Sequence, residues 1–564
     1  MANLVNEARE KVNGILNNAY IKAAAAGELP EGITLKGTVE IPKDTSNGDF
    51  AANHAMAGAR DFHMAPKAIA DKLIKYADLD GTWFSSIEVA GPGFINLRLN
   101  HGWYEDVLKT INAEGEHYGD LDEGKGRKVM VEFVSANPTG PMHMGNARGG
   151  VLGDALASVL SKAGYDVYRE FYINDTGNQI EKFAESIDAR YRQLILGEDA
   201  VEFPDDGYHG DDIKELAAKF YEKYGDKYLE YQKEEKYAIM ASFGLENNIP
   251  KMKKDLERYG IHYDEWFSES TLHESGFVFE TVEKLTELGY TYEKDGALWL
   301  KTTELVKGCE KDDVLKRANG FYTYFAADIA YHRNKLETRG FDKAINIWGA
   351  DHHGHVARLK GALDALGLDG EHRLEVVLMQ LVKLMENGQE VRMSKRSGKM
   401  ISLSNLLDDI PVDAARYFFN SKPESPVIFD IELAKRQDSE NPVYYVQYAH
   451  ARICTMIENL KNEGYTVKDD ADLTLLIEDA EIDLIKQLSL LPDTVHIAAR
   501  DYDPSHINTF VTDLSTRFHK FYTVCRIKGE EEGILYARLY LADTVRKVLE
   551  TALSIIGVSA PEKM

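Results

Sequence analysis

The sequence of 564 residues is short of cysteine, of long apolar runs and of positive charge. Its three cysteines, Cys309, Cys454 and Cys525, stand far apart, which excludes a zinc quartet and a disulfide framework and favours a reducing cytoplasm. No stretch reaches the roughly 18 apolar residues that a membrane-spanning helix needs, so we expect no membrane partner. The polar first segment, MANLVNEAREKVNG, lacks the apolar core of a signal peptide. We therefore expect a cytoplasmic protein.

Negative charge dominates, because the formal net charge is −27. Phosphate contacts need lysine and arginine, so this balance argues against a nucleic-acid partner unless those residues gather on one face. The hydrophobic content of 44% and the charged content of 28% are ordinary for a soluble globular protein. At roughly 150 residues per domain, the length predicts three or four domains.

Hydrophobic patterning divides the chain into three parts. In residues 1–112, a helical opening and the alternating segment WFSSIEVAGPGFINLRLN predict an α+β domain. Residues 113–440 begin with the polar linker EGEHYGDLDEGKGRK and then predict an α/β domain. Within it, the charged, tyrosine-rich stretch of about 177–300 predicts a mostly helical insertion. Residues 441–564 show helical periodicity alone, which predicts an all-α domain.

The middle part has the pattern of a doubly wound parallel sheet, as in Rossmann-like domains. KVMVEFVS predicts a buried strand, the apolar spacing from His143 to Ala163 predicts a helix that Gly164 caps, and YDVYREFYI predicts the next strand. AINIWGAD predicts a further strand that leads into the helix HHGHVARLKGALDALG. LEVVLMQLVKLM predicts another strand, followed by a turn at Asn387–Gly388 and by the segment EVRMSKRSGK.

Two short motifs about 250 residues apart carry the chemistry. In SANPTGPMHMGNARGG, His143, Gly145 and Asn146 fall at a loop-to-helix junction, where unpaired N–H groups and the positive end of the helix suit a triphosphate. Gly145 lets a purine approach the backbone, because it has no Cβ. The second motif, VRMSKRSGK, predicts a short loop that can bring cations to a departing pyrophosphate. Its polar residues are Arg392, Ser394, Lys395 and Arg396.

The pair of motifs resembles the His-x-Gly-His and Lys-Met-Ser-Lys-Ser signatures of class I aminoacyl-tRNA synthetases. The surrounding segments EFVSANPTGPMHMGNARGG, YREFYINDTGNQI, NPVYYVQYAHARI and IIGVSAPEKM resemble the arginine-specific family. GDFAANHAMAGAR and GPGFINLRL resemble the N-terminal domain found only in that family. The matches fall in all three parts. They imply a tRNA-elbow-binding domain, a catalytic domain and a C-terminal anticodon-binding domain, in that order.

The sequence departs from the family pattern in both signatures. Asn146 replaces the second histidine, and its amide can donate a hydrogen bond but carries no charge. Arg392 and Arg396 replace the usual first lysine and last serine, whereas Lys395 is retained. We therefore expect activity, with the transition-state charge held mainly by His143 and Lys395.

The resemblance implies an ATP-dependent ligase that converts L-arginine to arginyl-adenylate and transfers the arginyl group to tRNA(Arg). It also implies that tRNA binds before arginine is activated. We expect ATP to bring Mg²⁺, no permanently bound metal, and a monomer. A class I synthetase for another amino acid and an inactive, tRNA-binding paralogue remain alternatives, the latter because of Asn146.

The resemblance also implies the site residues. A guanidinium offers a planar fork of donors that carboxylates match, and an aromatic ring can pack on it. The residues implied for arginine are Glu132, Ser135, Asn137, Tyr324, Asp328 and His352. Those for ATP are Pro138, Thr139, Gly140, His143, Gly145, Asn146, Gly349, Asp351, Met393 and Lys395. Those for catalysis are His143, Asn146, Arg392, Ser394 and Lys395, and those for tRNA are Phe94, Asn96, Tyr445, Tyr448 and Arg452.

Simpler interpretations remain open for several of these residues. Glu132 could be an exposed charge at a strand end, and Asp328 could cap a helix. Tyrosines at helical spacing after residue 440 could belong to a core. The histidines of WGADHHGH suggest a metal site, but a zinc site needs further ligands that no neighbour supplies, so we favour a nucleotide contact for this segment.

Overall fold

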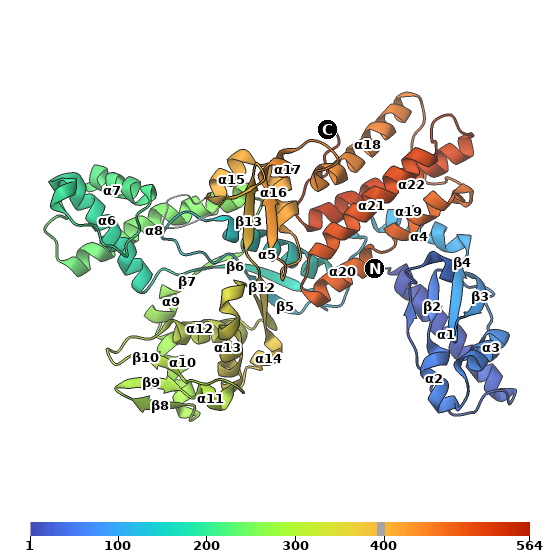
Figure 1. The fold of residues 1–564 in the computed structure, drawn as a ribbon, viewed down its shortest axis with the longest axis horizontal. Coiled ribbons are helices and arrows are strands. Elements are labelled where there is room, and N and C mark those ends of the chain that lie inside the picture. Colours follow the sequence, from blue (N-terminus) through green and yellow to red (C-terminus); the bar gives the residue numbers. More distant parts are fainter. Residues whose placement is uncertain (1, 392–400) are drawn as a thin grey trace.

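The computed structural model describes residues 2–391 and 401–564 (Figure 1). The N-terminal part is an antiparallel sheet with strand order β1-β2-β4-β3, covered by helices. Its strands are β1 (Val39–Glu40), β2 (Phe50–Ala52), β3 (Phe84–Ala90) and β4 (Phe94–Leu99), and its helices are α1 (Leu4–Ala25), α2 (His54–Phe62) and α3 (Pro66–Tyr76). The α+β prediction for this part is confirmed.

A single helix connects this sheet to the rest of the chain. Helix α4 (His101–Glu114) packs on α19 (Asp479–Leu488) and α22 (Glu532–Ile555) of the C-terminal bundle. The N-terminal helix reaches the same bundle, because Arg9 lies 2.7 Å from the Asp493 carboxylate. The sheet therefore lies beside the C-terminal helices and away from the central sheet (Figure 1).

The central sheet is parallel throughout, with strand order β12-β11-β5-β6-β7. Alternate residues of its strands enter two different cores: Phe171 and Ile345 face the core that contains α5, whereas Tyr172 and Ala344 face the core that contains α12 and α13. Helices thus cover both faces, which confirms the doubly wound class. The elements are β5 (Lys128–Glu132), α5 (Met144–Lys162), β6 (Asp166–Ile173), β7 (Glu265–Ser268), α12 (Tyr324–Arg333), β11 (Lys343–Gly349), α13 (His353–Ala365), α14 (Gly370–Arg373) and β12 (Leu374–Met379).

The stretch of about 177–300, predicted as a mostly helical insertion, consists mainly of helices, with a few short strands among them. Three helices form an arm with a hydrophobic core of its own, at the left of Figure 1. The chain then returns to the central sheet as β7, a four-residue edge strand too short to show a clear periodicity. The arm contains α6 (Asn178–Leu196), α7 (Asp211–Tyr224) and α8 (Lys233–Arg258). The elements after β7 are α9 (Ser270–Glu274), α10 (Phe277–Glu287), and a small antiparallel sheet of β8 (Thr291–Lys294), β9 (Ala297–Leu300) and β10 (Asp313–Lys316), with α11 (Thr302–Leu305) between β9 and β10.

A second small sheet follows β12. The predicted Asn387–Gly388 turn joins β13 to β14, with φ values of 50° and 74° at the two turn residues, as a tight hairpin requires. β15 pairs with β13 in parallel. The elements are β13 (Val382–Glu386), β14 (Gln389–Val391), α15 (Leu403–Asp409), α16 (Val412–Phe419), β15 (Val427–Asp430) and α17 (Ile431–Lys435).

The C-terminal part is a helical bundle, as predicted. Its helices are α18 (Pro442–Asn462), α19, α20 (Leu491–Asp501), α21 (Ser505–Val524) and α22. After α22, residues 556–561 lie between α16 and α18, and we call them the tail. The Arg416 Nε donates to the Ile556 carbonyl (3.2 Å), the Gln447 amide to the Ser559 carbonyl (3.0 Å), and the His450 Nδ1–H to the Pro561 carbonyl (2.9 Å). None of the helices in the described part of the chain is long and apolar enough to cross a membrane.

Candidate active site

The predicted site residues gather where the central strands end. Because the strands are parallel, the loops that follow β5, β6, β7 and β11 leave the same edge of the sheet. Glu132 is the last residue of β5, Gly349 is the last residue of β11, and Glu269 comes directly after β7. The site therefore lies at the carboxyl edge, beside the N-terminal end of α5.

The first motif builds the start of α5. His143 is the N-cap residue, and its Nδ1 accepts a hydrogen bond from the Gly145 N–H (3.1 Å). The Asn146 Oδ1 accepts from the His143 N–H (2.9 Å), which completes a capping box. Gly145 lets the imidazole fold back over the helix, since a Cβ there would lie 3.0 Å from the His143 Cε1. Asn146 thus has a structural role that the sequence interpretation did not foresee.

The second motif lies outside the described residues, so the structure gives no position for Arg392, Met393, Ser394, Lys395 or Arg396. Its two flanks are described. β14 ends at Val391, and after the motif Ser402 pairs with His143 across an isolated antiparallel bridge. The Leu403 N–H also donates to the Met142 carbonyl (2.8 Å). Ser402 and Leu403, which follow the motif, therefore lie beside the N-cap of α5.

Glu132 is buried and doubly bound. Its Oε2 accepts from the Lys335 ammonium at 2.6 Å, and its Oε1 accepts from the Ser135 hydroxyl at 2.9 Å. Lys335 has no exposed side-chain surface and also donates to the Asn346 Oδ1 (3.2 Å), while the Asn346 amide contacts the His332 Nε2 (2.7 Å). The interpretation of Glu132 as an exposed strand-end charge is wrong, because the carboxylate is part of an interior network.

The loop after β5 has a strained backbone. Val134 and Ser135 adopt positive φ angles of 69° and 41°, which non-glycine residues rarely adopt and which a β-branched side chain disfavours. The reversal brings the Ser135 hydroxyl to Glu132 and, as acceptor, to the Tyr172 N–H (3.2 Å). Asn137 follows with its side chain exposed at the edge of the sheet.

Two of the next three predicted residues lie against the helical arm. The Pro138 carbonyl accepts from the Asn248 amide of α8 (2.9 Å), and Thr139 is buried. A Cβ on Gly140 would lie 3.4 Å from the Asp212 carboxylate of α7. The arm therefore supports the loop that leads into α5.

Helix α12 brings Tyr324 and Asp328 to the same edge. Tyr324 is 43% exposed, and its hydroxyl lies against Gly177, where a Cβ would approach it to 2.9 Å. Asp328 accepts a hydrogen bond from the His355 Nε2 at 2.8 Å. Burial raises the pKa of the Asp328 carboxyl, His355 opposes that rise, and Glu132 and Glu269 add to it. The cap role considered for Asp328 does not apply, because Thr323 caps this helix.

Sequence reasoning missed Glu269, which is 3% exposed and directly follows β7. Its carboxylate accepts from the Thr176 hydroxyl (2.9 Å) and from the His273 Nε2 (3.3 Å). With Glu132 and Asp328 it forms a group of three acidic side chains at one edge of the sheet. An acidic residue directly after a strand would have been the signal for Glu269. The sequence pattern did not predict that strand, β7.

The segment after β11 is more open. His352 and Asp351 have exposed side chains, 57% and 83%, and their charged atoms lie 3.8 Å apart. Gly349 ends the strand beside them, and Trp348 lies against His352 and His355. Among the described residues, no group of three or more histidine, cysteine or acidic side chains could hold a metal ion.

The residues predicted for tRNA differ in exposure. On α18 and α21, an aromatic strip is exposed to solvent: Tyr448 is 41% exposed, its ring stacks on His519 and on Tyr444, and Arg452 lies over Tyr522 at 3.9 Å. Tyr445 contacts the same His519 ring. In the N-terminal sheet, Phe94 is 38% exposed, but Asn96 is only 3% exposed.

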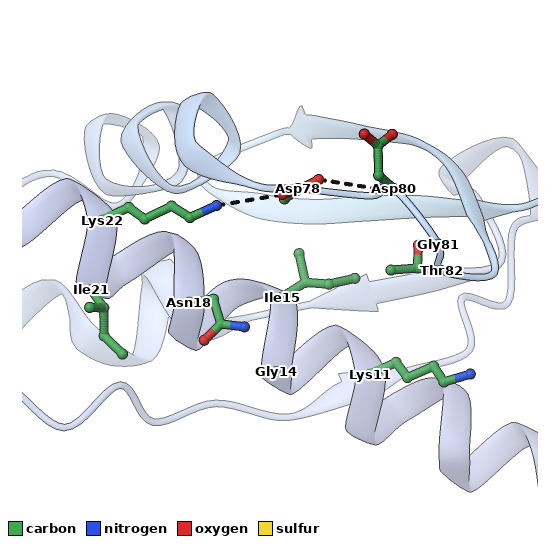
Figure 2. Close-up of a pocket in the computed structure, with 10 residues that line it drawn as sticks. All are labelled: Lys11, Gly14, Ile15, Asn18, Ile21, Lys22, Asp78, Asp80, Gly81 and Thr82. Atoms are coloured by element: carbon green, nitrogen blue, oxygen red, sulfur yellow. Dashed lines mark hydrogen bonds and ion pairs between the residues drawn. The ribbon is translucent and has the colours of Figure 1, made fainter.

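In the N-terminal part, a groove with a volume of about 540 Å³ lies between α1 and the loop 78–82 (Figure 2). Lys22 lies 3.6 Å from Asp78 across it, and Lys11 covers the Trp83 ring at 3.0 Å. Its charged groups are exposed and of both signs, and it belongs to the sheet that lies away from the carboxyl edge described above. The groove is therefore separate from the candidate site.

Comparison with protein families gives three matches that together cover almost the whole chain. Residues 6–99 match the arginyl tRNA synthetase N terminal domain, residues 108–453 the catalytic domain of class I (R) tRNA synthetases, and residues 446–564 the DALR anticodon binding domain.

Individual proteins agree with these matches. The chain is 52% identical to the arginine–tRNA ligase of Acetivibrio thermocellus and 54% identical to that of Caldanaerobacter subterraneus, each over 100% of both chains. Its fold is similar to that of Thermus thermophilus arginyl-tRNA synthetase, with a TM-score of 0.76 and 21% identity over 99% of this chain and 100% of the other.

Proposed function

The chain belongs to the arginyl-tRNA synthetase family, which makes it an arginine–tRNA ligase, and from that premise we propose how its described side chains serve the reaction. The observation that carries the assignment is identity of about half the residues to arginine–tRNA ligases over the full length of both chains. Arginine, ATP and tRNA are the substrates. These identities argue against both alternatives, a synthetase for another amino acid and an inactive, tRNA-binding paralogue.

Arginine binds, we propose, with its guanidinium toward the acidic group of Asp328, Glu269 and Glu132. A guanidinium presents several donors in one plane, and only a site with several acceptors can pair them. Asp328 carries the main contact, because Lys335 already occupies one Glu132 oxygen. Tyr324 packs on the flat cation. Ser135, Asn137 and His352 border the same edge and hold the α-amino and carboxylate end.

ATP binds at the start of α5, where unpaired N–H groups and the helix end attract phosphate. His143 and Gly145 meet the phosphates, Asn146 holds His143 in place, and Pro138, Thr139 and Gly140 shape the loop. Gly349 and Asp351 contact the adenosine. Arg392, Met393, Ser394 and Lys395 act from the second motif, as the sequence predicts. Mg²⁺ enters with ATP as part of the substrate.

The reaction then proceeds in two steps. An arginine carboxylate oxygen attacks the α-phosphorus in line, and the bond from that phosphorus to the bridging oxygen breaks, so pyrophosphate leaves with the electron pair. A ribose hydroxyl of the tRNA 3′ end next attacks the arginyl carbonyl, and AMP leaves. Positioning and charge stabilisation supply most of the acceleration, without a covalent enzyme intermediate.

tRNA contacts two distant parts of the chain. On the aromatic strip of α18 and α21, Tyr445 and Tyr448 offer rings on which unpaired anticodon bases stack. Arg452, which lies over the Tyr522 ring, adds a positive charge beside them. Phe94 offers a ring to the tRNA elbow, whereas the burial of Asn96 leaves it only a supporting role. Residues 1–112, 113–440 and 441–564 then act as elbow-binding, catalytic and anticodon-binding domains. The enzyme works as a cytoplasmic monomer.

Two measurements test this assignment. Charging assays with each amino acid should give product with arginine alone, and product with another amino acid would refute the specificity. Pyrophosphate exchange should require tRNA, because the binding-competent pocket is populated only when RNA contacts select it. Equal exchange rates with and without tRNA would refute that part.

A further inference from the structure

Helix α5 contains a fully buried arginine, Arg148. Arg148 lies in the second turn of the helix, with 0% of its surface exposed. Its guanidinium donates to backbone carbonyls on two other segments: to Gln380 (2.5 Å), and to Lys422 (3.0 Å), Pro423 (3.3 Å) and Ser425 (2.9 Å), with the Ser421 hydroxyl at 3.5 Å.

This cation has no carboxylate partner in the described part of the chain, and residues 392–400, RMSKRSGKM, contain no acidic side chain. Its Nε is buried without a hydrogen bond. Burial lowers the pKa of the Arg148 guanidinium to about 10. Buried charges are normally paired with an opposite charge, so a buried guanidinium held by neutral acceptors is costly and needs a reason.

The carbonyls that Arg148 binds belong to the base of the small sheet. The Gln380 N–H donates to the Pro423 carbonyl (2.9 Å), and the Val427 N–H donates to the Leu381 carbonyl (3.2 Å). Directly after these contacts the chain enters β13 and β15, and the β13–β14 hairpin ends at Val391, immediately before the second motif. One side chain thus connects the helix that begins at His143 to the base of this hairpin.

We propose that Arg148 is a positioning residue for arginine activation, which fixes the β13–β14 hairpin, whose last described residue is Val391, against α5, whose N-cap is His143. The inference rests on the proposed function, because it assumes that both motifs grip one polyphosphate. The planar guanidinium of arginine suits this task, since its N–H groups bind several carbonyls at once in a fixed geometry. A lysine ammonium has the same charge but cannot span them.

The kinetic signature of such a residue differs from that of a general stabiliser. A variant that merely unfolds more often lowers the active fraction, so kcat falls and every KM stays the same. A variant whose two phosphate-binding elements are misplaced loses affinity for ATP and pyrophosphate, while arginine, bound at Asp328 and Glu269, is unaffected. The ratio of the two KM changes therefore separates the two roles.

The experiment compares Arg148→Lys and Arg148→Met with Arg538→Lys in the full-length enzyme, by pyrophosphate exchange at saturating tRNA. Arg538 is a matched control: it is 8% exposed, donates to Glu481 (2.6 Å) and to the Arg526 carbonyl, and lies in the C-terminal bundle. We expect kcat/KM for ATP to fall about 30-fold or more in both Arg148 variants, with the KM for arginine within about twofold. The control should keep both KM values.

Two results would overturn the proposal: ATP kinetics of the Arg148→Lys variant that match the unaltered enzyme, or equal changes in the KM for ATP and for arginine. If Arg148→Met does not fold, Arg148→Lys decides. Failure of the unaltered enzyme to charge arginine would instead refute the proposed function, so the two failures are distinguishable.

Discussion

Replacing Lys335 with methionine tests the buried pair at the end of β5. Lys335 has no exposed side-chain surface, and its ammonium lies 2.6 Å from the Glu132 Oε2. Methionine keeps the length and apolar body of lysine but removes the charge. Glu132 would then remain in the interior with only the Ser135 hydroxyl as a partner.

The expected loss of stability is large, because it leaves an unpaired carboxylate inside the protein. Breaking one side of a buried ion pair costs roughly 3–5 kcal/mol. At about 2–4 °C per kcal/mol for a domain of ordinary size, the melting temperature of the catalytic domain should fall by roughly 6–20 °C. The double variant Lys335→Met/Glu132→Gln should regain most of this loss, since it leaves no buried charge.

Thermal melting followed by circular dichroism measures these differences. Arg436→Met is the control, because Arg436 pairs with Glu440 at the surface, where the two side chains are 44% and 67% exposed. Such an exposed pair contributes at most about 1 kcal/mol. A Lys335→Met variant that melts within about 2 °C of the unaltered protein, or a double variant that is less stable than the single one, would refute the reasoning.

Three further predictions concern the site. Asp328→Asn should raise the KM for arginine about 10- to 150-fold in pyrophosphate exchange, because a charge-assisted hydrogen bond contributes roughly 1.5–3 kcal/mol; an unchanged KM would contradict the assignment. Because burial raises the pKa of Asp328 and the ionised form binds the cation, the KM for arginine should climb on acidification at a higher pH than an exposed aspartate allows, and Asp328→Asn should abolish that dependence. Tyr448→Ala should raise the KM for tRNA about 5- to 150-fold in charging, the equivalent of roughly 1–3 kcal/mol of base stacking, while leaving the KM for arginine unchanged; equal effects on both would count against a stacking role.

Local patterns were sufficient to predict the elements that determine the architecture. The apolar spacing from residue 143 to 163 gave α5, and Gly164 adopts φ 88°, as the residue after a helix end often does. The turn between β13 and β14 was likewise predicted from its two central residues, Asn387 and Gly388. These features are short-range, and their physical causes lie within a few positions of the chain.

Long-range pairing was not predictable in the same way. Glu132 and Lys335 are 203 residues apart, and Lys335 lies in a π-helical turn that ends α12, so no periodicity announces their contact. The role of Asn146 was more accessible, because its position three residues after His143 has the spacing of a capping box.

The tail has a mechanical consequence. Its carbonyls accept hydrogen bonds from Gln447 and His450 of the helix that presents Tyr448, and from Arg416, which also pairs with Asp154 of α5. α18 therefore cannot slide along α16 unless these bonds break or the tail moves with it. The tail therefore links the helix that presents Tyr448 to Arg416, and the ion pair between Arg416 and Asp154 continues this connection to α5.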